Sequence, residues 1–258
     1  MRLIQLTDSH LFAHPEQTLL GIPTLASFRL VVEEVFERLA PVDALVLTGD
    51  LSQDASRESY ELLRDVVADY RVPAYCLPGN HDDAELMREV LSGDTLSCVP
   101  VAELGAWRFV LLDSVVPGHD YGQLRDGQYR LLDDALAGGM YSMVFVHHPP
   151  VAMDCPWLDT MRLRDGPQLL DALRPHDRCR AVVFGHAHQE FAAGEAGRTL
   201  YCTPSTCLQF LPRAAKFMLD SAHPGCRVFD LETDGSMRTF VHRLPFYPFL
   251  AAPDAAGY

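Results

Sequence analysis

The sequence predicts an α/β (α+β) fold in which two packed β-sheets are flanked by helices. In the first part of the chain, short apolar runs alternate with segments whose apolar residues repeat at helical spacing, which is typical of βαβ units. The last part carries strand-like runs separated by turns, which favours a β-rich meander. Two packed sheets with helices outside them satisfy both parts.

The predicted strands are short apolar runs, each bounded by glycine, proline or a charged residue. That pattern is typical of a buried strand rather than of a helix. The strands are expected over residues 2–7, 43–48, 73–77, 107–113, 142–147 and 181–184 in the first part, and over 198–203, 227–231 and 238–243 in the last part.

Helices are predicted where apolar residues recur at helical spacing between the strands. The segment 24–39 shows this spacing over its whole length, and Thr24 is its expected N-cap. The remaining helices are expected near residues 55–70, 84–92, 128–137 and 167–174.

Length and composition predict a single domain over residues 1–258 with a sizeable core, because 48% of the residues are hydrophobic. The tail over 245–258 is rich in proline, alanine and aromatic residues, so we expect it to pack on the surface. The net charge of −14 argues against binding to a nucleic acid polymer or an anionic membrane. No apolar run approaches the roughly 20 residues of a membrane span.

The N-terminal residues and the cysteines predict a cytoplasmic protein. The first apolar stretch is too short for a signal peptide and is interrupted by Asp8. The seven cysteines are irregularly spaced and include no CxxC pair, which favours buried, reduced thiols. The sequence leaves a homodimer open.

Short polar motifs follow five of the predicted strands. Because ligands of open α/β sheets bind at the carboxyl ends of strands, we expect these motifs to meet in one site. Aspartate, histidine and asparagine gathered there predict a metal site of imidazole and oxygen ligands. The motifs are Asp8-Ser9-His10, Gly49-Asp50, Gly79-Asn80-His81-Asp82, His147-His148 and Gly185-His186-Ala187-His188.

Each residue type in these motifs suits a particular role in metal binding. Asp8 and His10 point to the same side of an extended segment and can hold one ion together. Asp50 can bridge two ions through its two oxygens, and the neutral amide of Asn80 can ligate the second ion. A single motif of this kind, such as one Asp-x-His, would be weak evidence for a metal site. A histidine at the end of a strand is more often a polar residue whose hydrogen bonds are made within the protein. The ordered set of five motifs is far more specific.

The ordered set resembles the calcineurin-like metallophosphoesterase family. That family's pattern is Asp-x-His, Gly-Asp, Gly-Asn-His-Asp/Glu, His and Gly-His-x-His, and the match spans residues 8–188. The resemblance implies a four-layer αββα sandwich with two metal ions between the sheets. It implies that one ion takes Asp8, His10, Asp50 and His188, and that the other takes Asp50, Asn80, His147 and His186.

The resemblance also implies catalytic and substrate-contacting roles. His81 corresponds to the family's catalytic histidine, and the substrate is expected to contact His10, Asp50, Asn80, His81 and His188. Mixed nitrogen and oxygen ligands favour two divalent or trivalent ions, with Fe and/or Mn expected and Zn as an alternative.

Two details of the motifs leave alternatives open. His147 is the preferred ligand because it directly follows a strand, and the alternative is that His148 ligates. Some family members carry an aspartate that orients the catalytic histidine, and this chain has Gln53 at that position. The orienting group of His81 is therefore open among Asp54, Asp82, Asp83 and a backbone carbonyl.

Two further segments indicate the substrate. Residues 203–210 and 155–159, together with Leu11-Phe12 and the closing Gly257-Tyr258, resemble the bacterial class III 3′,5′-cyclic AMP phosphodiesterases from end to end. That resemblance implies an enzyme that hydrolyses cyclic AMP to 5′-AMP and lowers intracellular cyclic AMP. The residues expected to contact the base or ribose are Thr206, Cys207 and Trp157. The alternative for these segments is turn chemistry and ordinary core packing.

The implied reaction needs no covalent intermediate. Two ions would clamp the phosphate and activate a water that attacks in line with the 3′ oxygen. His81 would protonate that leaving oxygen or stabilise developing charge on the phosphoryl group. Two rival functions remain. One is a broader metallophosphoesterase acting on 2′,3′-cyclic nucleotides or general phosphodiesters, and the other is a nucleotide- or metal-responsive scaffold whose catalysis is incidental.

Overall fold

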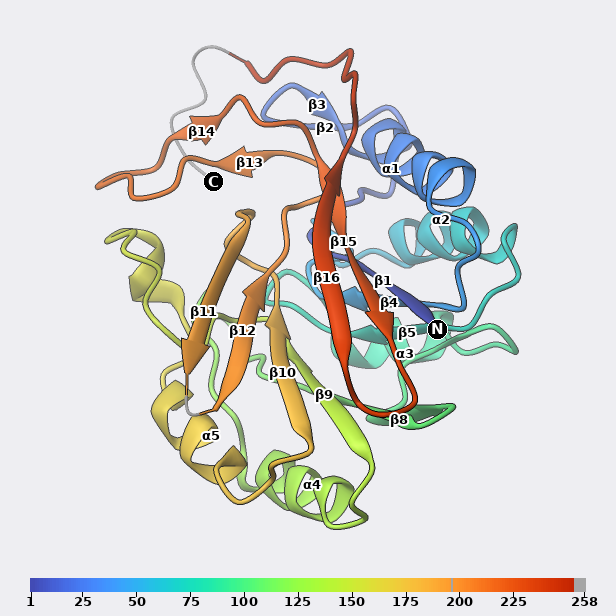
Figure 1. The fold of residues 1–258 in the computed structure, drawn as a ribbon. Helices are drawn as coiled ribbons and strands as arrows, with labels where there is room; N and C mark the ends of the chain where they lie inside the picture. Colours follow the sequence, from blue (N-terminus) through green and yellow to red (C-terminus); the bar gives the residue numbers. More distant parts are fainter. Residues whose placement is uncertain (196, 253–258) are drawn as a thin grey trace.

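The computed structural model of the chain describes residues 1–195 and 197–252. Within those residues, five α-helices and two six-stranded sheets form four layers in the order helix, sheet, sheet, helix (Figure 1). The αββα sandwich predicted from the sequence is therefore confirmed.

The first sheet combines a parallel centre with an antiparallel edge. Strand β1 pairs with β4 in parallel and with β15 antiparallel, and β4, β5 and β6 continue the parallel part. The order across the sheet is β16 (Met237–Arg243), β15 (Gly225–Leu231), β1 (Arg2–Leu6), β4 (Ala44–Thr48), β5 (Ala74–Leu77) and β6 (Leu96–Ser97).

The second sheet has the same construction with an antiparallel strand at each edge. Strands β8, β9, β10 and β12 run parallel, while β7 and β11 pair antiparallel with their neighbours. The order is β11 (Phe191–Glu195), β12 (Arg198–Cys202), β10 (Cys179–Phe184), β9 (Tyr141–Val146), β8 (Trp107–Leu112) and β7 (Val101–Leu104).

The helices cover the outer face of each sheet (Figure 1). Helices α1 (Thr24–Arg38), α2 (Arg57–Ala68) and α3 (Ala84–Val90) share an apolar core with the first sheet. Helices α4 (Asp126–Leu136) and α5 (Gly166–Leu173) share a second core with the second sheet. A short 3₁₀ helix spans Leu158–Met161.

Alternation along the strands builds a third core between the sheets. In β4, Val46 faces the second sheet while Leu45 and Leu47 face the helices, and in β9 Phe145 and Val144 divide in the same way. Each such apolar side chain contributes roughly 1.5–3 kcal/mol when fully buried. Because both faces are covered, the strands read as continuous apolar runs in the sequence.

The structure corrects several details of the sequence prediction. The strands near the C-terminus do not form one meander, because β12 joins the second sheet whereas β15 and β16 complete the first. Strand β11 was not predicted, since its residues include two alanines and a glycine and are mostly exposed. Thr24 is the first residue of α1 rather than its N-cap, because Pro23 occupies the cap position.

Further short strands were also missed, because two residues are too few to show alternation. They are β2 (Thr18–Leu19), β3 (Ile22–Pro23), β13 (Gln209–Phe210) and β14 (Leu219–Asp220), which form two small separate sheets, and β6 at the edge of the first sheet. The four-residue edge strand β7 was not predicted either.

The tail predicted over residues 245–258 is described only as far as residue 252, so Gly257 and Tyr258 lie outside the described residues. In the described part, the Tyr247 hydroxyl donates a hydrogen bond of 2.7 Å to Ser27 Oγ, whereas Phe246 is 74% exposed. No helix among the described residues is long and apolar enough to cross a membrane.

Candidate metal centre

The five polar motifs lie at the carboxyl ends of β1, β4, β5, β9 and β10, where the two sheets face each other. Backbone hydrogen bonds join the loops that carry them. Asp8 N donates to Gly49 O at 3.0 Å, His10 N donates to Asp50 O at 2.9 Å, and Gly185 N donates to His147 O at 3.1 Å. These bonds join loops within each sheet. Across the two sheets, His186 N donates to Asp8 Oδ1 and Oδ2 at 3.1 Å, so the loops of both sheets are connected into one rim.

Three of the predicted ligands form a first group at this rim. Ligand atoms of Asp8, His10 and His188 lie within 4.8 Å of one another, and all three residues are buried. His10 Nε2 is 3.1 Å from His188 Nε2, and His188 Nε2 is 3.4 Å from Asp8 Oδ1.

Four other predicted ligands form a second group around His147. Its Nε2 atom is 3.2 Å from Asp50 Oδ2, 3.2 Å from Asn80 Oδ1 and 3.2 Å from His186 Nδ1. Asp50 Oδ2 also lies 4.0 Å from His10 Nε2 in the first group. Asp50 therefore stands between the two groups, as a bridging ligand must.

The spacing of these donor atoms fits bound metal ions. Ligands about 2.0–2.2 Å from one ion lie about 3–3.5 Å from each other, which matches the separations in both groups. Imidazole lone pairs that face each other at such distances repel unless a cation lies between them or one nitrogen carries hydrogen. His186 Nε2 is buried and has no hydrogen-bond partner among the described residues. The residues present therefore fit a two-ion site.

The other nitrogen of three ligand histidines is anchored to the protein. His147 Nδ1 lies 2.8 Å from Thr48 O, His188 Nδ1 lies 2.8 Å from Leu208 O, and His10 Nδ1 lies 2.7 Å from Gln53 Oε1. An Nδ1–H that donates to such an acceptor leaves Nε2 without hydrogen and orients it for a metal. Each ring thus presents the same nitrogen to the centre.

Burial and charge set the ionisation of the group. Burial lowers the pKa of His10 and of His186 well below the ordinary value. Burial acts in the same direction on His147, but the charge and hydrogen bond of Asp50, together with the charge of Asp8 and the hydrogen bond to Thr48, outweigh it and raise the pKa of His147 to about 9. The pKa of Asp50 falls well below its usual range because His147 and other histidines outweigh the effect of its burial. Asp50 is therefore an anion that attracts a cation.

The backbone at the ligands is unusual. Five of the seven predicted ligands have φ between 47° and 63°, in the left-handed region that costs non-glycine residues about 1–3 kcal/mol each. They are Asp8, His10, Asp50, His186 and His188. These residues turn their side chains into the site at the expense of local backbone stability.

Two glycines of the motifs allow the loops to approach closely. A Cβ on Gly79 would lie 2.2 Å from Asp50 Oδ1, and one on Gly185 would lie 2.1 Å from Thr7 Oγ1 and 2.7 Å from Asp8 Oδ2. Any side chain at either position would displace a carboxylate of the site, which explains why glycine precedes Asn80 and His186.

His81 lies beside the ligands and is partly exposed. Its ring packs edge-on against His10 with the centroids 5.3 Å apart, and its backbone N donates to Asp50 Oδ1 at 2.9 Å. Gln53 also lies beside its side chain, with Nε2 3.3 Å from His81 Nδ1. The position at which the sequence departs from the family pattern thus places an amide next to the predicted catalytic ring.

The three acidic residues considered as orienting groups each have other partners. Asp82 accepts hydrogen bonds from the backbone N of Leu51, Ser52 and Gly79 at 2.9–3.1 Å and ties two ligand loops together. Asp83 accepts from two backbone N–H groups at the start of α3, and Asp54 accepts from Ala13 N, Ser56 N and Ser56 Oγ.

His148 lies behind His147 and not between the two ligand groups. Its Nδ1 is 2.8 Å from Ser114 Oγ, and its Nε2 is buried with no hydrogen-bond partner among the described residues. The distances around His147 Nε2 favour His147 as the ligand. A nitrogen of His148 nevertheless lies within 4.8 Å of nitrogens of His147 and His186, so the choice stays a prediction.

The predicted base- or ribose-contacting residues are held by internal packing. Thr206 and Cys207 are fully buried, with Thr206 N donating to Thr7 O at 3.1 Å and Cys207 N donating to Ser205 Oγ at 2.8 Å. Trp157 packs edge-on against Phe210 with the centroids 5.1 Å apart, and Phe210 stacks on His188 at 4.2 Å. Substrate contact by these residues stays a prediction, and Phe210 is a neighbour of the centre that sequence reasoning did not single out.

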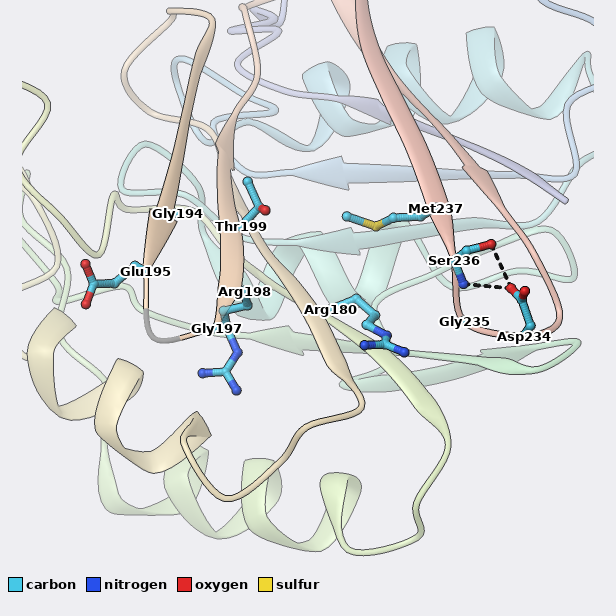
Figure 2. Close-up of a pocket in the computed structure, with 10 residues that line it drawn as sticks. All are labelled: Arg180, Gly194, Glu195, Gly197, Arg198, Thr199, Asp234, Gly235, Ser236 and Met237. Carbon is cyan, nitrogen blue, oxygen red and sulfur yellow. Dashed lines mark hydrogen bonds between the residues drawn. The ribbon is translucent and has the colours of Figure 1, made fainter.

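A cavity of about 770 Å³ lies away from this centre, between the β11–β12 turn and the β15–β16 turn (Figure 2). Its described lining includes Arg180, Arg198 and the Asp234–Ser236 turn, and contains none of the predicted site residues. This cavity therefore does not coincide with the candidate metal centre.

Comparison with known proteins adds a family and relatives to this geometry. The model of the family described as calcineurin-like phosphoesterase matches residues 1–190. The chain is 40% identical to the 3′,5′-cyclic adenosine monophosphate phosphodiesterase CpdA of Pseudomonas aeruginosa over 99% of this chain and 94% of that protein. It is 36% identical to CpdA of Escherichia coli (strain K12) over 100% of this chain and 95% of that protein.

Solved structures of similar fold are more distant in sequence. A dimetal phosphatase from Danio rerio matches with a TM-score of 0.63 and 15% identity, over 94% of this chain and 96% of that chain. A purple acid phosphatase from yellow lupin matches with a TM-score of 0.64 and 13% identity, over 94% of this chain and 51% of that chain. At such identities the likeness shows a shared fold.

Proposed function

The chain belongs to the calcineurin-like phosphoesterase family, and from that premise we propose that it is a two-metal phosphodiesterase that hydrolyses 3′,5′-cyclic AMP to 5′-AMP. The observation that carries the proposal is the pair of buried ligand groups that share Asp50, with His81 beside them. Relatives named as cyclic AMP phosphodiesterases cover nearly the whole chain at 36–40% identity, which favours this substrate over others.

The proposed centre holds two ions. One would take Asp8, His10, Asp50 and His188, and the other would take Asp50, Asn80, His147 and His186. When bound, the ions supply positive charge to the phosphate and lower the pKa of a water so that it is nucleophilic near neutral pH. Imidazole nitrogens and carboxylate oxygens favour Fe or Mn, with Zn as the alternative.

The residues of the chain then position the reaction. A water oxygen forms a bond to phosphorus, the bond from phosphorus to the 3′ oxygen breaks, and a proton goes to that 3′ oxygen. His81 is partly exposed beside the ligands, so we assign it the hydrogen bond to the leaving oxygen or to the phosphoryl oxygens. His10, Asp50, Asn80 and His188 would line the phosphate position, because each has a donor atom in one of the two ligand groups.

The proposal extends to the protein's setting. All seven cysteines are free, and six of them are buried, which supports the reduced compartment expected from the sequence. We therefore retain a cytoplasmic location, in which the activity would lower intracellular cyclic AMP. A homodimer stays a prediction, and we assign no residue to its interface.

A substrate panel tests the proposal. Purified protein with its metals quantified is offered cyclic AMP, cyclic GMP, 2′,3′-cyclic AMP and bis(p-nitrophenyl) phosphate. We expect the highest kcat/KM on a 3′,5′-cyclic nucleotide, with the 5′-monophosphate as the product. A higher kcat/KM on 2′,3′-cyclic AMP would replace the proposal with a broader phosphodiesterase. No hydrolysis of any substrate at two metals per chain would favour a scaffold.

A further inference from the structure

Gln53 lies between two histidine rings of the site. Its Oε1 is 2.7 Å from His10 Nδ1, and its Nε2 is 3.3 Å from His81 Nδ1. Its backbone is fixed, because Gln53 N donates to Leu11 O at 2.7 Å and Leu11 N donates to Leu51 O at 3.0 Å. The amide therefore reaches both rings from a rigid loop.

The chemistry of an amide makes the two rings unequal. A primary amide has one end that accepts hydrogen bonds and one end that only donates them. Two rings that each turn Nδ1 to the same amide must therefore differ, since one Nδ1 carries hydrogen and the other does not. This conclusion holds whichever way round the amide oxygen and nitrogen are placed.

The position of His10 Nε2 indicates which of the two rings carries hydrogen on Nδ1. Its Nε2 faces the first ligand group, 3.1 Å from His188 Nε2 and 4.0 Å from Asp50 Oδ2. A nitrogen that ligates a metal carries no hydrogen, so the hydrogen of His10 is on Nδ1 and is donated to Gln53 Oε1. The amide hydrogens of Gln53 then face His81, and His81 Nδ1 accepts.

We propose that Gln53 is a positioning residue that places the hydrogen of His81 on Nε2, the ring nitrogen turned away from the amide. His81 would then offer a hydrogen-bond donor to the phosphoryl or 3′ oxygen. Gln53, which holds the His81 ring, is itself hydrogen-bonded to His10, a predicted metal ligand. A carboxylate at position 53 would have the opposite effect, because it accepts hydrogen bonds from both rings. The inference rests on the proposed function in one respect, namely that His10 is a metal ligand.

The first test observes the hydrogen directly. Protein labelled with ¹⁵N-histidine and loaded with zinc is examined by long-range ¹H–¹⁵N correlation, which distinguishes a nitrogen with hydrogen from one without. We expect His81 to carry hydrogen on Nε2 and none on Nδ1, and we expect Gln53→Glu to place hydrogen on Nδ1. Hydrogen on Nδ1 of His81 in the unmodified protein would overturn the proposal.

The second test measures whether Gln53 acts through His81. Gln53→Glu keeps an acceptor for His10, so metal content and KM should stay near their original values while kcat falls about 10–100-fold. In a His81→Ala background the same substitution should lower kcat no further. An equal loss in both backgrounds, or an unchanged kcat, would overturn the proposal.

Two variants serve as controls. Gln53→Met removes both polar contacts, so it should lower metal content as well as kcat, and it covers the case in which the glutamate variant does not fold. Gln128→Glu changes the same residue type outside the predicted site, where the side chain accepts a hydrogen bond from Asp113 N at 3.0 Å, and it should leave kcat and the His81 signals unchanged.

The design separates this inference from the proposed function. Both kinetic comparisons are run on cyclic AMP and on bis(p-nitrophenyl) phosphate. If the protein hydrolyses the aryl diester but not cyclic AMP, the proposed substrate is contradicted. The position of the hydrogen on His81 and the kinetics on the aryl diester would still decide the role of Gln53. Unchanged metal content in His10→Ala would show that His10 is not a metal ligand. That result would contradict both the ligand set of the proposed function and the hydrogen placed on His10 Nδ1.

Discussion

The metal-ligand loops and the aromatic wall beside them are built by different means. The wall consists of Trp157, Phe210 and Phe217, whose rings pack edge-on against one another at 5.1–5.6 Å. The loops of the metal centre hold buried polar side chains on a strained backbone, with positive φ at five of the predicted ligands. The two regions meet where Phe210 stacks on His188 with an interplanar angle of 12°.

The two regions depend on the sequence in different ways. The ligand loops need a particular residue at each position, because a change of type removes a ligand atom or closes the space beside it. The wall needs apolar volume, and several residues could supply it. Substitutions in the ligand loops should therefore act on metal content and turnover, whereas those in the wall should act on packing and on substrate affinity.

The largest effect is expected at Asp50, the residue shared by the two ligand groups. Asp50→Asn keeps the shape of the side chain and removes the negative charge from a position between two cations. Metal content and turnover should fall together, with turnover reduced by more than about 100-fold, since even residues behind a ligand cost about 10–100-fold. Elemental analysis beside cyclic AMP turnover checks this. Two retained metals with a near-normal rate would remove Asp50 from the bridging position.

His81→Ala is expected to separate catalysis from metal binding within the same loops. Both ions should stay bound, because Asn80 is unchanged, while cyclic AMP hydrolysis slows by about 10²–10⁴-fold. The loss should be smaller for bis(p-nitrophenyl) phosphate, since nitrophenolate is a good leaving group. An equal loss on both substrates would reject protonation of the leaving oxygen and assign His81 to charge stabilisation on the phosphoryl group.

The adjacent histidines 147 and 148 give an intermediate comparison. His147→Ala should remove one ion, because Nε2 of His147 lies 3.2 Å from three other ligand atoms. His148→Ala should mainly disturb orientation, at about 10–100-fold in affinity or activity. Metal analysis of both variants decides the matter, and a greater loss of metal from His148→Ala would reverse the assignment.

The smallest effect is expected in the wall. Trp157→Phe keeps the edge-on packing against Phe210 and Phe217 but removes Nε1, a buried donor without a partner among the described residues. If that donor serves the nucleotide, KM for cyclic AMP should rise about 3–10-fold, as expected for one hydrogen bond. KM for the aryl diester and the metal content should not change. An equal change in KM on both substrates would assign Trp157 to packing alone.

The sequence predicted some parts of the molecule well and others not at all. Apolar runs identified the central strands of both sheets, because strands buried on both faces carry apolar residues at every position. The loops of the metal centre could be predicted because their motifs contain glycines with a physical role. Gly79 and Gly185 leave space for carboxylates that come from other loops. Edge strand β11 and the two-residue strands had no such pattern. Phe210 was missed because the sequence around an apolar residue does not show that its ring will stack on a distant histidine such as His188.

The role of Gln53 could not be predicted for a related reason. Its two contacts, to His10 and to His81, join residues that are 43 and 28 positions away along the chain. Sequence reasoning identified the position as a departure from the family pattern but considered only Asp54, Asp82, Asp83 and a backbone carbonyl as orienting groups. Those three carboxylates instead organise the loops and the start of α3.

The most direct test of the account is a metal titration of the stripped protein. Metal is removed with a chelator, Mn²⁺ is returned in measured equivalents, and cyclic AMP hydrolysis is followed with identification of the product. We expect negligible activity without metal, activity that rises as the second site fills, and 5′-AMP as the product. Hydrolysis that persists in the metal-free protein, or formation of 3′-AMP, would contradict it.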